Sequence, residues 1–374
     1  MERVLVTGGA GFIGSFTVDL LIEGGYEVTI LDNLEQQVHR GETPEYLNKN
    51  ATFVNGDVRD TELLKKIIVD ADAVIHLAAV VGVGQSMYQL ERYVDANTRG
   101  TSTLLDIIVN EENNVKKLVV ASSMSIYGEG KYFCEACGEE KYPGLRSVEQ
   151  LRNRVWEPLC PDCGGRLRPL PTDEGKPLMP TSIYAMTKRH QEEMCLLSGK
   201  TYGVPTVALR YFNAYGPRQS LGNPYTGVCA IFSSRILNDM PPYIFEDGEQ
   251  RRDFVYVGDV AKANLLALER NAADYQAVNI GMGEATSIRR IADVLIDVYG
   301  VKVEPHVSQK YRKGDVRHCY ADTSKARDLL GYAPSTSLED GLRELAGWAR
   351  EHEWGAKNLF ETALRELRNR GLAE

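Results

Sequence analysis

Short apolar runs rich in β-branched residues alternate with helical patterns along the first half of the chain. The runs that predict buried strands are residues 3–8, 27–33, 51–57, 73–79 and 116–123. Residues 12–25 and 61–71, which lie between some of these runs, repeat apolar residues at helical spacing. Buried strands that alternate with helices are typical of a parallel sheet covered on both faces. The pattern predicts an α/β fold with a Rossmann-type doubly wound parallel sheet.

The second half of the chain departs from this rhythm in two places. Residues 206–216 and 276–283 still predict later strands of the same sheet. Residues 129–171 instead gather Cys, Pro and Gly, which is typical of an irregular insertion. Beyond residue 284 the pattern is mainly helical. It ends in residues 357–372, whose apolar positions predict a helix docked on the surface: Leu359, Phe360, Ala363, Leu364 and Leu367.

These changes of pattern divide the chain into three parts. Residues 1–128, 172–215 and 253–283 are predicted to form the dinucleotide-binding Rossmann domain. Residues 216–252 and 284–374 are predicted to form a smaller, mostly C-terminal substrate domain, and 129–171 an insertion.

Composition narrows the classes of protein that are compatible with this pattern. The 374 residues are 43% hydrophobic, which is enough for a large core. With 43 basic and 52 acidic residues the net charge is −9, so we do not expect nucleic acid as a partner. No apolar run approaches the ~20 residues that span a bilayer, and the start of the chain lacks a signal-peptide pattern. We expect no membrane association.

The glycine-rich stretch VLVTGGAGFIG directly follows the first predicted strand and opens the first helix. Gly8, Gly11 and Gly14 have the spacing at which a tight turn lets the backbone approach a pyrophosphate, whose charge the helix N-terminus attracts. Asp32 ends the next strand, where a carboxylate accepts hydrogen bonds from a ribose and repels a 2′-phosphate. NAD is therefore favoured over NADP. Asp57, after the third strand, is predicted to reach the adenine or simply to cap the strand end.

A possible catalytic set lies downstream of the cofactor motif. Tyr184 and Lys188 are four residues apart in a helical pattern, so they share one face of the helix. Such a pair is common by chance, but here it follows a dinucleotide turn and the stretch ASSMSIYG, which contains Ser123. A free tyrosine has a pKa near ~10, and a neighbouring ammonium favours its phenolate form. The combination of this pair with the two upstream stretches is specific, whereas the pair alone is not.

At this point the chain resembles the extended short-chain dehydrogenase/reductase family, and within it the nucleotide-sugar epimerases and dehydratases. The resemblance covers nearly the whole chain except residues 129–171. The stretches that carry it are TGGAGFIG, GDVRD, HLAA, SSMSIYG, YAMTK, RYFNAYGPR, RDFVYVGDVA, NIGMG, RKGDVRH and LGYAPSTSLEDGL.

The resemblance implies a role for each matching residue. Tyr184 would be the acid/base, Lys188 would also bond the nicotinamide ribose, and Ser123 would bond the reacting sugar hydroxyl. His76 is expected to be a packed structural histidine. Asn97 matches a helix asparagine of the family, with a helix cap or a buried helix kink as alternatives. The expected NAD contacts are Gly8, Gly11, Phe12, Ile13, Gly14, Asp32, Asn33, Asp57, Val58, Leu77, Ala78, Ala79, Asn97, Tyr184, Lys188 and Tyr211.

A second group of matches implies a site for the diphosphate of the substrate. Asn213 is expected to contact this diphosphate, and Arg252 and Arg312 would clamp it, while Ser123 contacts the sugar. Guanidinium groups suit phosphate oxygens because they donate two parallel hydrogen bonds. Asp315 would then face the nucleotide ribose, although each of these residues is also compatible with a surface ion pair.

The two residues after Ser123 separate the possible reactions. The family's 4,6-dehydratases have an Asp-Glu or similar pair there, which supplies the acid and the base of the elimination. Met124 and Ser125 can do neither, so the chain is expected to be a 4-epimerase that acts through a transient 4-keto sugar. A 4,6-dehydratase, a 4-keto reductase and a non-enzymatic dinucleotide sensor remain as alternatives.

Two CxxCG stretches lie within residues 129–171. Cys134, Cys137, Cys160 and Cys163 form two pairs separated by twenty-two residues, which is a strong signal for a tetrahedral structural zinc. The remaining cysteines, Cys195, Cys229 and Cys319, are scattered, so no disulfide framework is expected and a reducing cytoplasm fits best.

The insertion lies between Ser123 and Tyr184 and lengthens the family's usual gap. Its seven basic residues are nearly balanced by six acidic ones from Lys131 to Arg168, which argues against a nucleic-acid finger. We interpret it as a zinc-stapled lid or rim that shapes sugar specificity or braces a subunit contact. Within the family such a ribbon resembles dTDP-L-rhamnose 4-epimerases, and UDP-glucose/galactose epimerases are the alternative. The resemblance also implies a homodimer built from the helix at about 95–113 and the helix with Tyr184.

Overall fold

The computed structural model describes residues 2–352 and 359–374; residues 357 and 358 of the predicted last helix lie outside this part. Its centre is a seven-stranded sheet in the order β14-β9-β5-β4-β1-β2-β3, and every neighbouring pair is parallel. The strands are β1 (Arg3–Thr7), β2 (Glu27–Asp32), β3 (Thr52–Asn55), β4 (Ala73–His76), β5 (Lys117–Ser123), β9 (Thr206–Tyr211) and β14 (Gln276–Ile280). All seven lie in the runs that the sequence pattern predicts.

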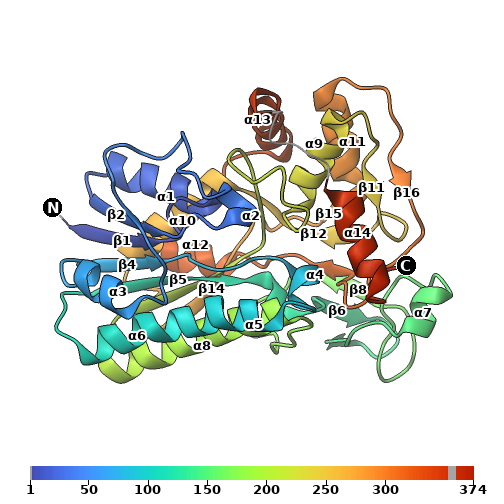
Figure 1. The fold of residues 1–374 in the computed structure, drawn as a ribbon. Helices are drawn as coiled ribbons and strands as arrows, with labels where there is room; N and C mark the ends of the chain where they lie inside the picture. The colour runs from blue at the N-terminus through green and yellow to red at the C-terminus, as the bar shows by residue number, and fades with distance from the viewer. Residues whose placement is uncertain (1, 353–358) are drawn as a thin grey trace.

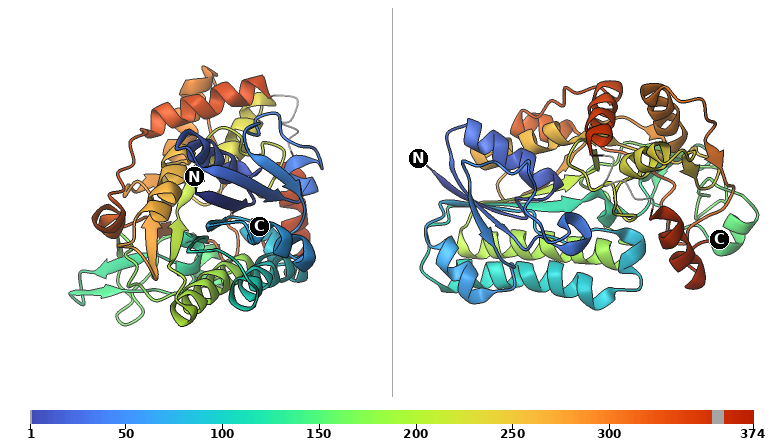
Figure 2. Two further views of the ribbon diagram at one scale, coloured as in Figure 1. Left: turned by 90° about the vertical axis from the view of Figure 1, so that its left-hand side faces the viewer. Right: turned by 45° about the horizontal axis from the view of Figure 1, so that its top comes forward.

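Helices cover both faces of this sheet, as Figures 1 and 2 show. One face carries α1 (Phe12–Glu23), α10 (Val257–Glu269) and α12 (Ser324–Leu330), and the other carries α3 (Thr61–Ile68), α6 (Gly100–Asn110) and α8 (Ile183–Tyr202). Each face has its own apolar core, because successive side chains along each strand point to opposite faces of the sheet. The predicted α/β, doubly wound fold is confirmed.

The strand order reverses between β1 and β4. Loops leave the carboxyl ends of these neighbouring strands in opposite directions, which opens a crevice where α/β proteins bind ligands. Short helical segments lie beside it: α2 (Gln36–His39), α4 (Val83–Ser86), α5 (Leu90–Tyr93), the π-helix η1 (Val94–Arg99) and the 3-10 helix η2 (Met124–Tyr127).

A second layer of structure lies beyond the carboxyl ends of the sheet. Its helices α9 (Val228–Leu237), α11 (Ile288–Tyr299) and α13 (Leu338–Glu351) pack on one another around a third apolar core. Small sheets accompany them: β10 (Asn213–Tyr215) with β13 (Phe254–Tyr256), β11 (Tyr243–Ile244) with β16 (His306–Val307), and β12 (Arg251–Arg252) between β15 (Thr286–Ser287) and β17 (His318–Cys319).

The prediction for residues 206–216 was wrong in one respect. The stretch forms two strands, and only β9 belongs to the central sheet, whereas β10 pairs with β13. The backbone changes partners at this point, because Phe212 N donates to Ile280 O and Asn213 N donates to Asp253 O. Hydrophobic pattern alone does not reveal such a change of partner.

Residues 129–171 form an excursion between η2 and α8. It contains a three-stranded antiparallel sheet in the order β7-β6-β8, with β6 (Lys131–Cys134), β7 (Glu139–Lys141) and β8 (Arg168–Leu170), and the short helix α7 (Val148–Arg152). We call these residues the insertion. In Figure 1 it extends to the lower right, below the last helix.

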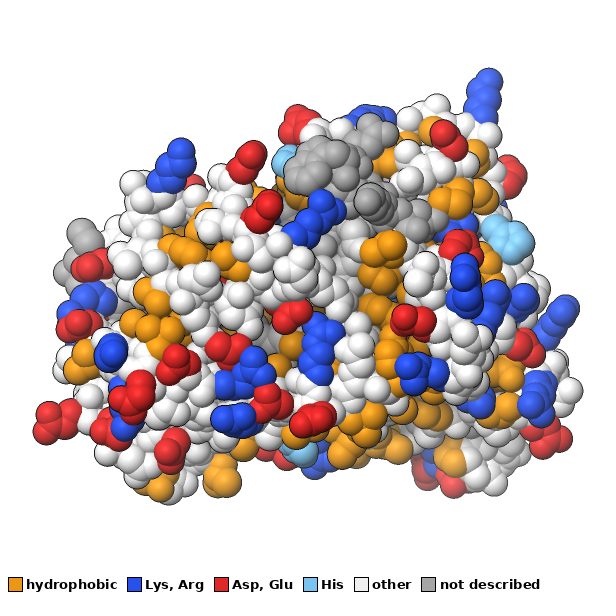
Figure 3. Space-filling view, in the orientation of Figure 1, with side chains coloured by type: hydrophobic (Ala, Val, Ile, Leu, Met, Phe, Trp, Pro, Cys, Tyr) orange, Lys and Arg blue, Asp and Glu red, His pale blue; other side chains and the backbone are white. Residues whose placement is uncertain are grey.

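The last helix, α14 (Phe360–Asn369), is docked as the apolar stripe predicts. Ala363, Leu364 and Leu367 are buried, and Glu366 accepts hydrogen bonds from the hydroxyls of Tyr88 and Tyr225, both at 2.8 Å. Charged side chains of both signs are interspersed over the face in Figure 3. Among the described helices, none combines the length and apolarity needed to cross a membrane.

Candidate active site

The glycine turn between β1 and α1 is shaped by close backbone contacts. Gly8 has a φ of +72°, and a Cβ on it would lie 2.7 Å from Ala78 N. A Cβ on Gly14 would lie 2.2 Å from Gly8 O. Only glycine fits at these positions, and Gly11, which precedes α1, has no side chain to cover the helix N-terminus. The first amides of α1 can therefore bind an anion.

The predicted ribose carboxylate lies against this turn. Asp32 accepts hydrogen bonds from Ala10 N at 3.1 Å and from Leu34 N at 2.9 Å. Asn33 donates to Asp57 at 2.8 Å. Burial alone would raise the pKa of Asp57, but hydrogen bonds from Arg59 hold that pKa at about 2. Acidic and amide groups therefore gather at the carboxyl ends of β2 and β3.

The candidate catalytic residues meet at the carboxyl end of β5. Helix α8 begins after Ser182, whose hydroxyl accepts Ala185 N at 3.1 Å. It presents Tyr184 and Lys188, both buried, toward the sheet. Ser123, the last residue of β5, lies close enough to the Tyr184 hydroxyl to lower its pKa. The structure thus brings the predicted serine and tyrosine together.

Burial shifts the pKa values of both titratable groups. Burial raises the pKa of Tyr184 to about 12, and the nearby Ser123 side chain acts in the opposite direction. Burial lowers the pKa of Lys188 to about 8, although the neighbouring Cys195 and Glu192 act in the opposite direction. A dry environment disfavours both charged forms, so each group needs a partner in order to ionise.

Lys188 is held by a chain of buried hydrogen bonds that sequence reasoning missed. Its Nζ donates to Gln191 at 2.9 Å, and Gln191 donates to Thr101 at 2.7 Å. Thr101 contacts His76 Nε2 at 2.9 Å, and His76 Nδ1 contacts Thr7 at 2.7 Å. Burial and the charge of Lys188 lower the pKa of His76 to about 3, so this histidine is a neutral structural link. The only sequence signal for Gln191 is a polar residue one helical turn after Lys188.

Two other predicted cofactor residues have protein partners for their polar atoms. Asn97 is buried within η1 and bonds both the N–H (2.7 Å) and the C=O (3.0 Å) of Val80, and it also donates to Thr187. Asn97 therefore braces the segment after β4. This position corresponds to the alternative in which Asn97 lies at a buried helix kink. Tyr211 ends β9 in register with Ser123, and its hydroxyl donates to Asn264 at 2.5 Å.

Other predicted cofactor residues also lie along this edge of the sheet. Phe12 and Ile13 open α1, and both pack against the core of the second layer. Val58 follows β3 and is buried, close enough to α6 that a Cβ on Gly100 would lie 2.6 Å from its Cγ2. Leu77, Ala78 and Ala79 directly follow β4, and Leu77 N donates to Thr7 O at 3.0 Å.

The predicted diphosphate residues gather on the second layer. Asp315 accepts a hydrogen bond from Arg312 at 2.7 Å and pairs with Arg252 at 3.5 Å. Burial would raise the pKa of Asp315, but the two arginines hold it below its usual range. Asn213 N donates to Asp253 O beside Arg252, and within the described residues the buried Asn213 Oδ1 has no hydrogen-bond partner. We call Arg252, Arg312 and Asp315 the clamp.

The four cysteines of the insertion converge. Their Sγ atoms all lie within 4.8 Å of one another, with 3.5 Å between those of Cys134 and Cys163 and 3.8 Å between those of Cys137 and Cys160. Gly138 and Gly164 each have a φ near +70° and turn the backbone around the sulfurs. This donor set and spacing fit one tetrahedral metal ion.

The fold and this edge of the sheet define the class of protein. The chain matches the NAD dependent epimerase/dehydratase family over residues 4–147 and 163–281. It belongs to this family of enzymes.

Individual relatives cover nearly the whole chain. It is 37% identical over 350 residues to a dTDP-L-rhamnose 4-epimerase from Burkholderia thailandensis. This match covers 93% of this chain and 94% of the relative. The crystal structure of UDP-glucose 4-epimerase with UDP-glucose from Thermotoga maritima has a TM-score of 0.78 at 35% identity, covering 94% and 99% of the two chains. The complex of UDP-glucose 4-epimerase with NAD from Thermus thermophilus has a TM-score of 0.73 at 31% identity, covering 93% and 99%.

Proposed function

We propose that this protein is an NAD-dependent nucleotide-sugar 4-epimerase. The observation that carries the proposal is the approach of Ser123 to the hydroxyl of Tyr184, one helical turn from Lys188, at the edge of the sheet that holds the glycine turn. Relatives named as 4-epimerases of dTDP-L-rhamnose and UDP-glucose support it.

The residues around the glycine turn fit NAD. Gly11 leaves the first amides of α1 uncovered for a pyrophosphate, and Asp32 accepts hydrogen bonds where a ribose hydroxyl would lie. The same carboxylate would repel the 2′-phosphate of NADP. NAD held there would supply the hydride acceptor and donor that a change of configuration at C4 of the sugar requires.

The chain's own residues would handle the proton of this reaction. Tyr184 would take the proton of the sugar 4-hydroxyl and later give it back to the keto oxygen. Its raised pKa means that the phenol is protonated at neutral pH until a positive charge lies beside it. The Lys188 ammonium is placed by α8 to supply part of that charge, and Ser123 would orient the hydroxyl.

The residues after Ser123 favour epimerisation over dehydration. Met124 and Ser125 begin η2, and the Ser125 N–H and Oγ both donate to Ser123 Oγ, at 3.1 and 2.9 Å. Neither side chain can supply the acid and the base that elimination of water requires. A 4-keto sugar formed here would therefore be reduced again instead of being dehydrated.

The clamp would hold the substrate diphosphate. Arg252 and Arg312 present guanidinium groups to Asp315, and Asn213, whose buried Oδ1 has no partner within the described residues, pairs with Phe254, two residues after Arg252. Asp315 would then orient both arginines, which is compatible with its predicted position near the ribose. In this arrangement residues 216–252 and 284–374 form the substrate domain, and residues 1–128, 172–215 and 253–283 the NAD domain.

The insertion would hold a structural zinc ion. Four thiolates leave no open coordination position, so the metal would stabilise residues 129–171 and take no part in the sugar chemistry. A reducing cytoplasm, expected from the cysteine usage, would keep these thiols available. One zinc per chain in the purified protein would support this; a protein that holds no metal would contradict it.

A homodimer would form through α6 and α8. These helices run side by side along one face of the sheet (Figure 2), and exposed apolar side chains lie along α8 and before α6. The exposed residues are Leu90, Val94, Met186, Leu197 and Tyr202. Leu197→Glu should convert a dimer to a monomer in analytical ultracentrifugation, and a protein that sediments as a monomer from the start would contradict the assignment.

The proposed activity is tested without added cofactor. Purified protein is incubated with UDP-galactose and, separately, with dTDP-L-rhamnose, and both mixtures are followed by proton NMR. A C4 epimer at equilibrium, without net reduced nicotinamide, is the expected result and identifies the nucleotide sugar. A 4-keto-6-deoxy product would show a dehydratase instead and would overturn the role of Met124 and Ser125.

A further inference from the structure

The insertion sends a buried arginine into the second layer. Arg146 is 7% exposed, and its guanidinium donates two hydrogen bonds to Glu246, both at 2.9 Å. The same guanidinium donates to the backbone oxygens of Trp156 and Asp315, both at 3.0 Å. The bond to Asp315 places an insertion residue directly on the backbone of the clamp.

A second contact comes from Glu157, further along the insertion. Its carboxylate accepts hydrogen bonds from Arg317 at 2.7 and 2.9 Å and from His318 Nε2 at 2.8 Å. The other side of Arg317 bonds Glu246 at 2.9 Å and Asp247 at 2.7 and 2.9 Å. The segment just after Asp315 is therefore held between the insertion and Glu246.

Glu246 is the shared partner of these two arginines. It is 1% exposed and has a φ of +55°, a left-handed conformation that is costly for a residue with a side chain. Its N–H donates to Lys310 O at 2.7 Å. Such a conformation persists only where the surroundings determine it strongly, and two guanidinium groups from different parts of the chain do so here.

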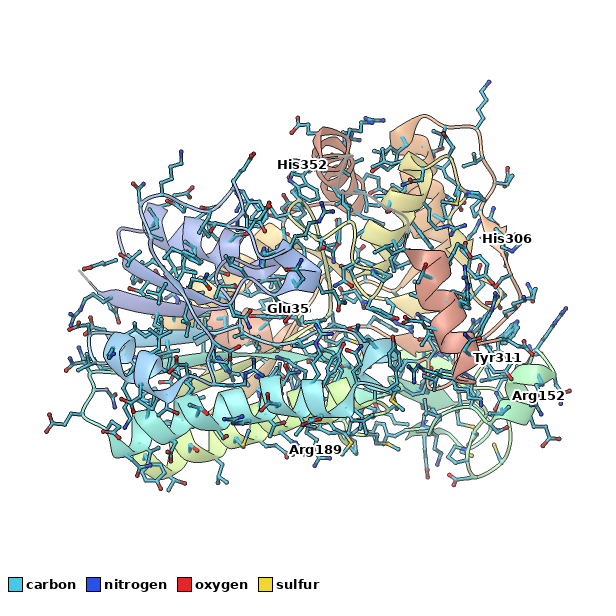
Figure 4. The ribbon with its side chains drawn as sticks, in the orientation of Figure 1. Glu35, Arg152, Arg189, His306, Tyr311 and His352 are labelled. Atoms are coloured by element: carbon cyan, nitrogen blue, oxygen red, sulfur yellow. The ribbon has the colours of Figure 1, made fainter. Side chains whose placement is uncertain are left out.

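Apolar packing supports the start of the same loop. Leu151 and Trp156 of the insertion are buried against Tyr311, which directly precedes Arg312. Figure 4 shows Tyr311 close to Arg152 of α7. Residues 311–318, which contain two members of the clamp, are thus fixed at both ends by residues 146–157.

We infer that Arg146 and Glu157 are positioning residues for the nucleotide-diphosphate clamp, so that the insertion controls how tightly the nucleotide is bound. This rests on the proposed function. Arg146 fixes the backbone of Asp315, whose carboxylate orients Arg252 and Arg312. Buried, paired charges select one arrangement, and loss of one partner releases it. Of the lid and rim interpretations of the insertion, this inference favours a rim that supports the nucleotide-binding clamp.

The test measures nucleotide affinity apart from turnover. Arg146→Lys keeps the charge but loses the two-pronged geometry, and Glu157→Gln keeps the shape but loses the charge. Arg168→Lys and Glu135→Gln make the same changes in an exposed pair of the insertion, whose nitrogen and oxygen lie 3.2 Å apart. UDP and dTDP are titrated into each NAD-loaded protein by calorimetry, well below its melting temperature. KM and kcat follow with the active nucleotide sugar.

Arg146→Lys and Glu157→Gln should weaken nucleotide binding and raise KM about tenfold, with kcat and bound NAD within about twofold of wild type. The control variants should bind as wild type does. Unchanged affinity in both Arg146→Lys and Glu157→Gln, or an equal loss in the controls, would overturn the inference. Weakened nucleotide binding in a protein that epimerises no sugar would support the inference and contradict the proposed activity. A wild type that binds neither nucleotide would overturn both.

Discussion

Helix α8 and the clamp place buried titratable groups in opposite electrostatic environments. Tyr184 and Lys188 on α8 are buried, and neither forms an ion pair with any residue that the structure describes; burial shifts their pKa values to about 12 and about 8. At the clamp Asp315 is half-buried, and its pKa is held below the usual range because Arg312 and Arg252 flank it. Burial has therefore raised the pKa of Tyr184. At Asp315 the two flanking arginines overcome the effect of burial on the pKa.

This difference distinguishes residues suited to proton transfer from residues suited to holding a ligand. An unpaired buried group changes its proton affinity strongly when a charge arrives, which suits an acid/base. A paired buried group stays ionised and keeps its geometry, which suits a residue that orients a ligand. Variants on α8 should therefore affect turnover, whereas variants at the clamp or the insertion should affect affinity.

The largest effect is expected from Tyr184→Phe. Removal of the hydroxyl deletes the proton acceptor, so kcat should fall by about three orders of magnitude, within the range of general acid–base catalysis. The melting temperature and the bound NAD should be retained, because the ring still packs against Tyr93. NMR-followed epimerisation measures the rate, and a variant with a tenth of wild-type activity would rule out this role.

Arg252→Ala should act on affinity. Loss of one charge-assisted contact to the diphosphate is expected to raise KM about thirtyfold, with a much smaller change in kcat. Arg251→Ala is the matched control, because Arg251 is the adjacent residue of β12 and is exposed. A fall in kcat with unchanged KM would assign Arg252 to the chemistry and erase the contrast between the two regions.

Loss of the metal should weaken the insertion and, through it, the clamp. Cys163→Ser removes the exposed ligand, so bound zinc measured by mass spectrometry should fall below one tenth per chain. The melting temperature should drop by several degrees and UDP affinity about threefold, while bound NAD is unchanged. Retention of full zinc and full affinity would show that the four thiols do not act as a metal site.

The smallest effect concerns pH. Because burial puts the pKa of Lys188 at about 8, below its ordinary 10.5, the ammonium is present below pH 8 and lost as the pH rises through it. Activity should therefore decline above pH 8. Gln191→Leu removes the acceptor of the ammonium, so the decline should begin about half a unit lower. An unchanged pH profile would leave Gln191 with a packing role only.

Much of the central sheet was predictable because its strands are buried on both faces. A continuous apolar run such as residues 117–123 has few other stable environments. The glycine turn and the pair Tyr184 and Lys188 were predictable for a similar reason, since their spacing has a local geometric meaning. The switch of β10 to another sheet depends on which distant strand lies beside it, and no local pattern carries that information.

The sequence by itself determined the parts of this protein whose logic is local: the strands and helices of the sheet, the cofactor turn, the tyrosine–lysine spacing and the cysteine pairs. Only the tertiary structure decided which long-range partners meet. Arg146, Glu246 and Arg317 span about a hundred and seventy positions of the chain and together form no motif. They nevertheless share one buried hydrogen-bond network. Burial makes their charges dependent on each other, and burial is a property of the folded chain alone.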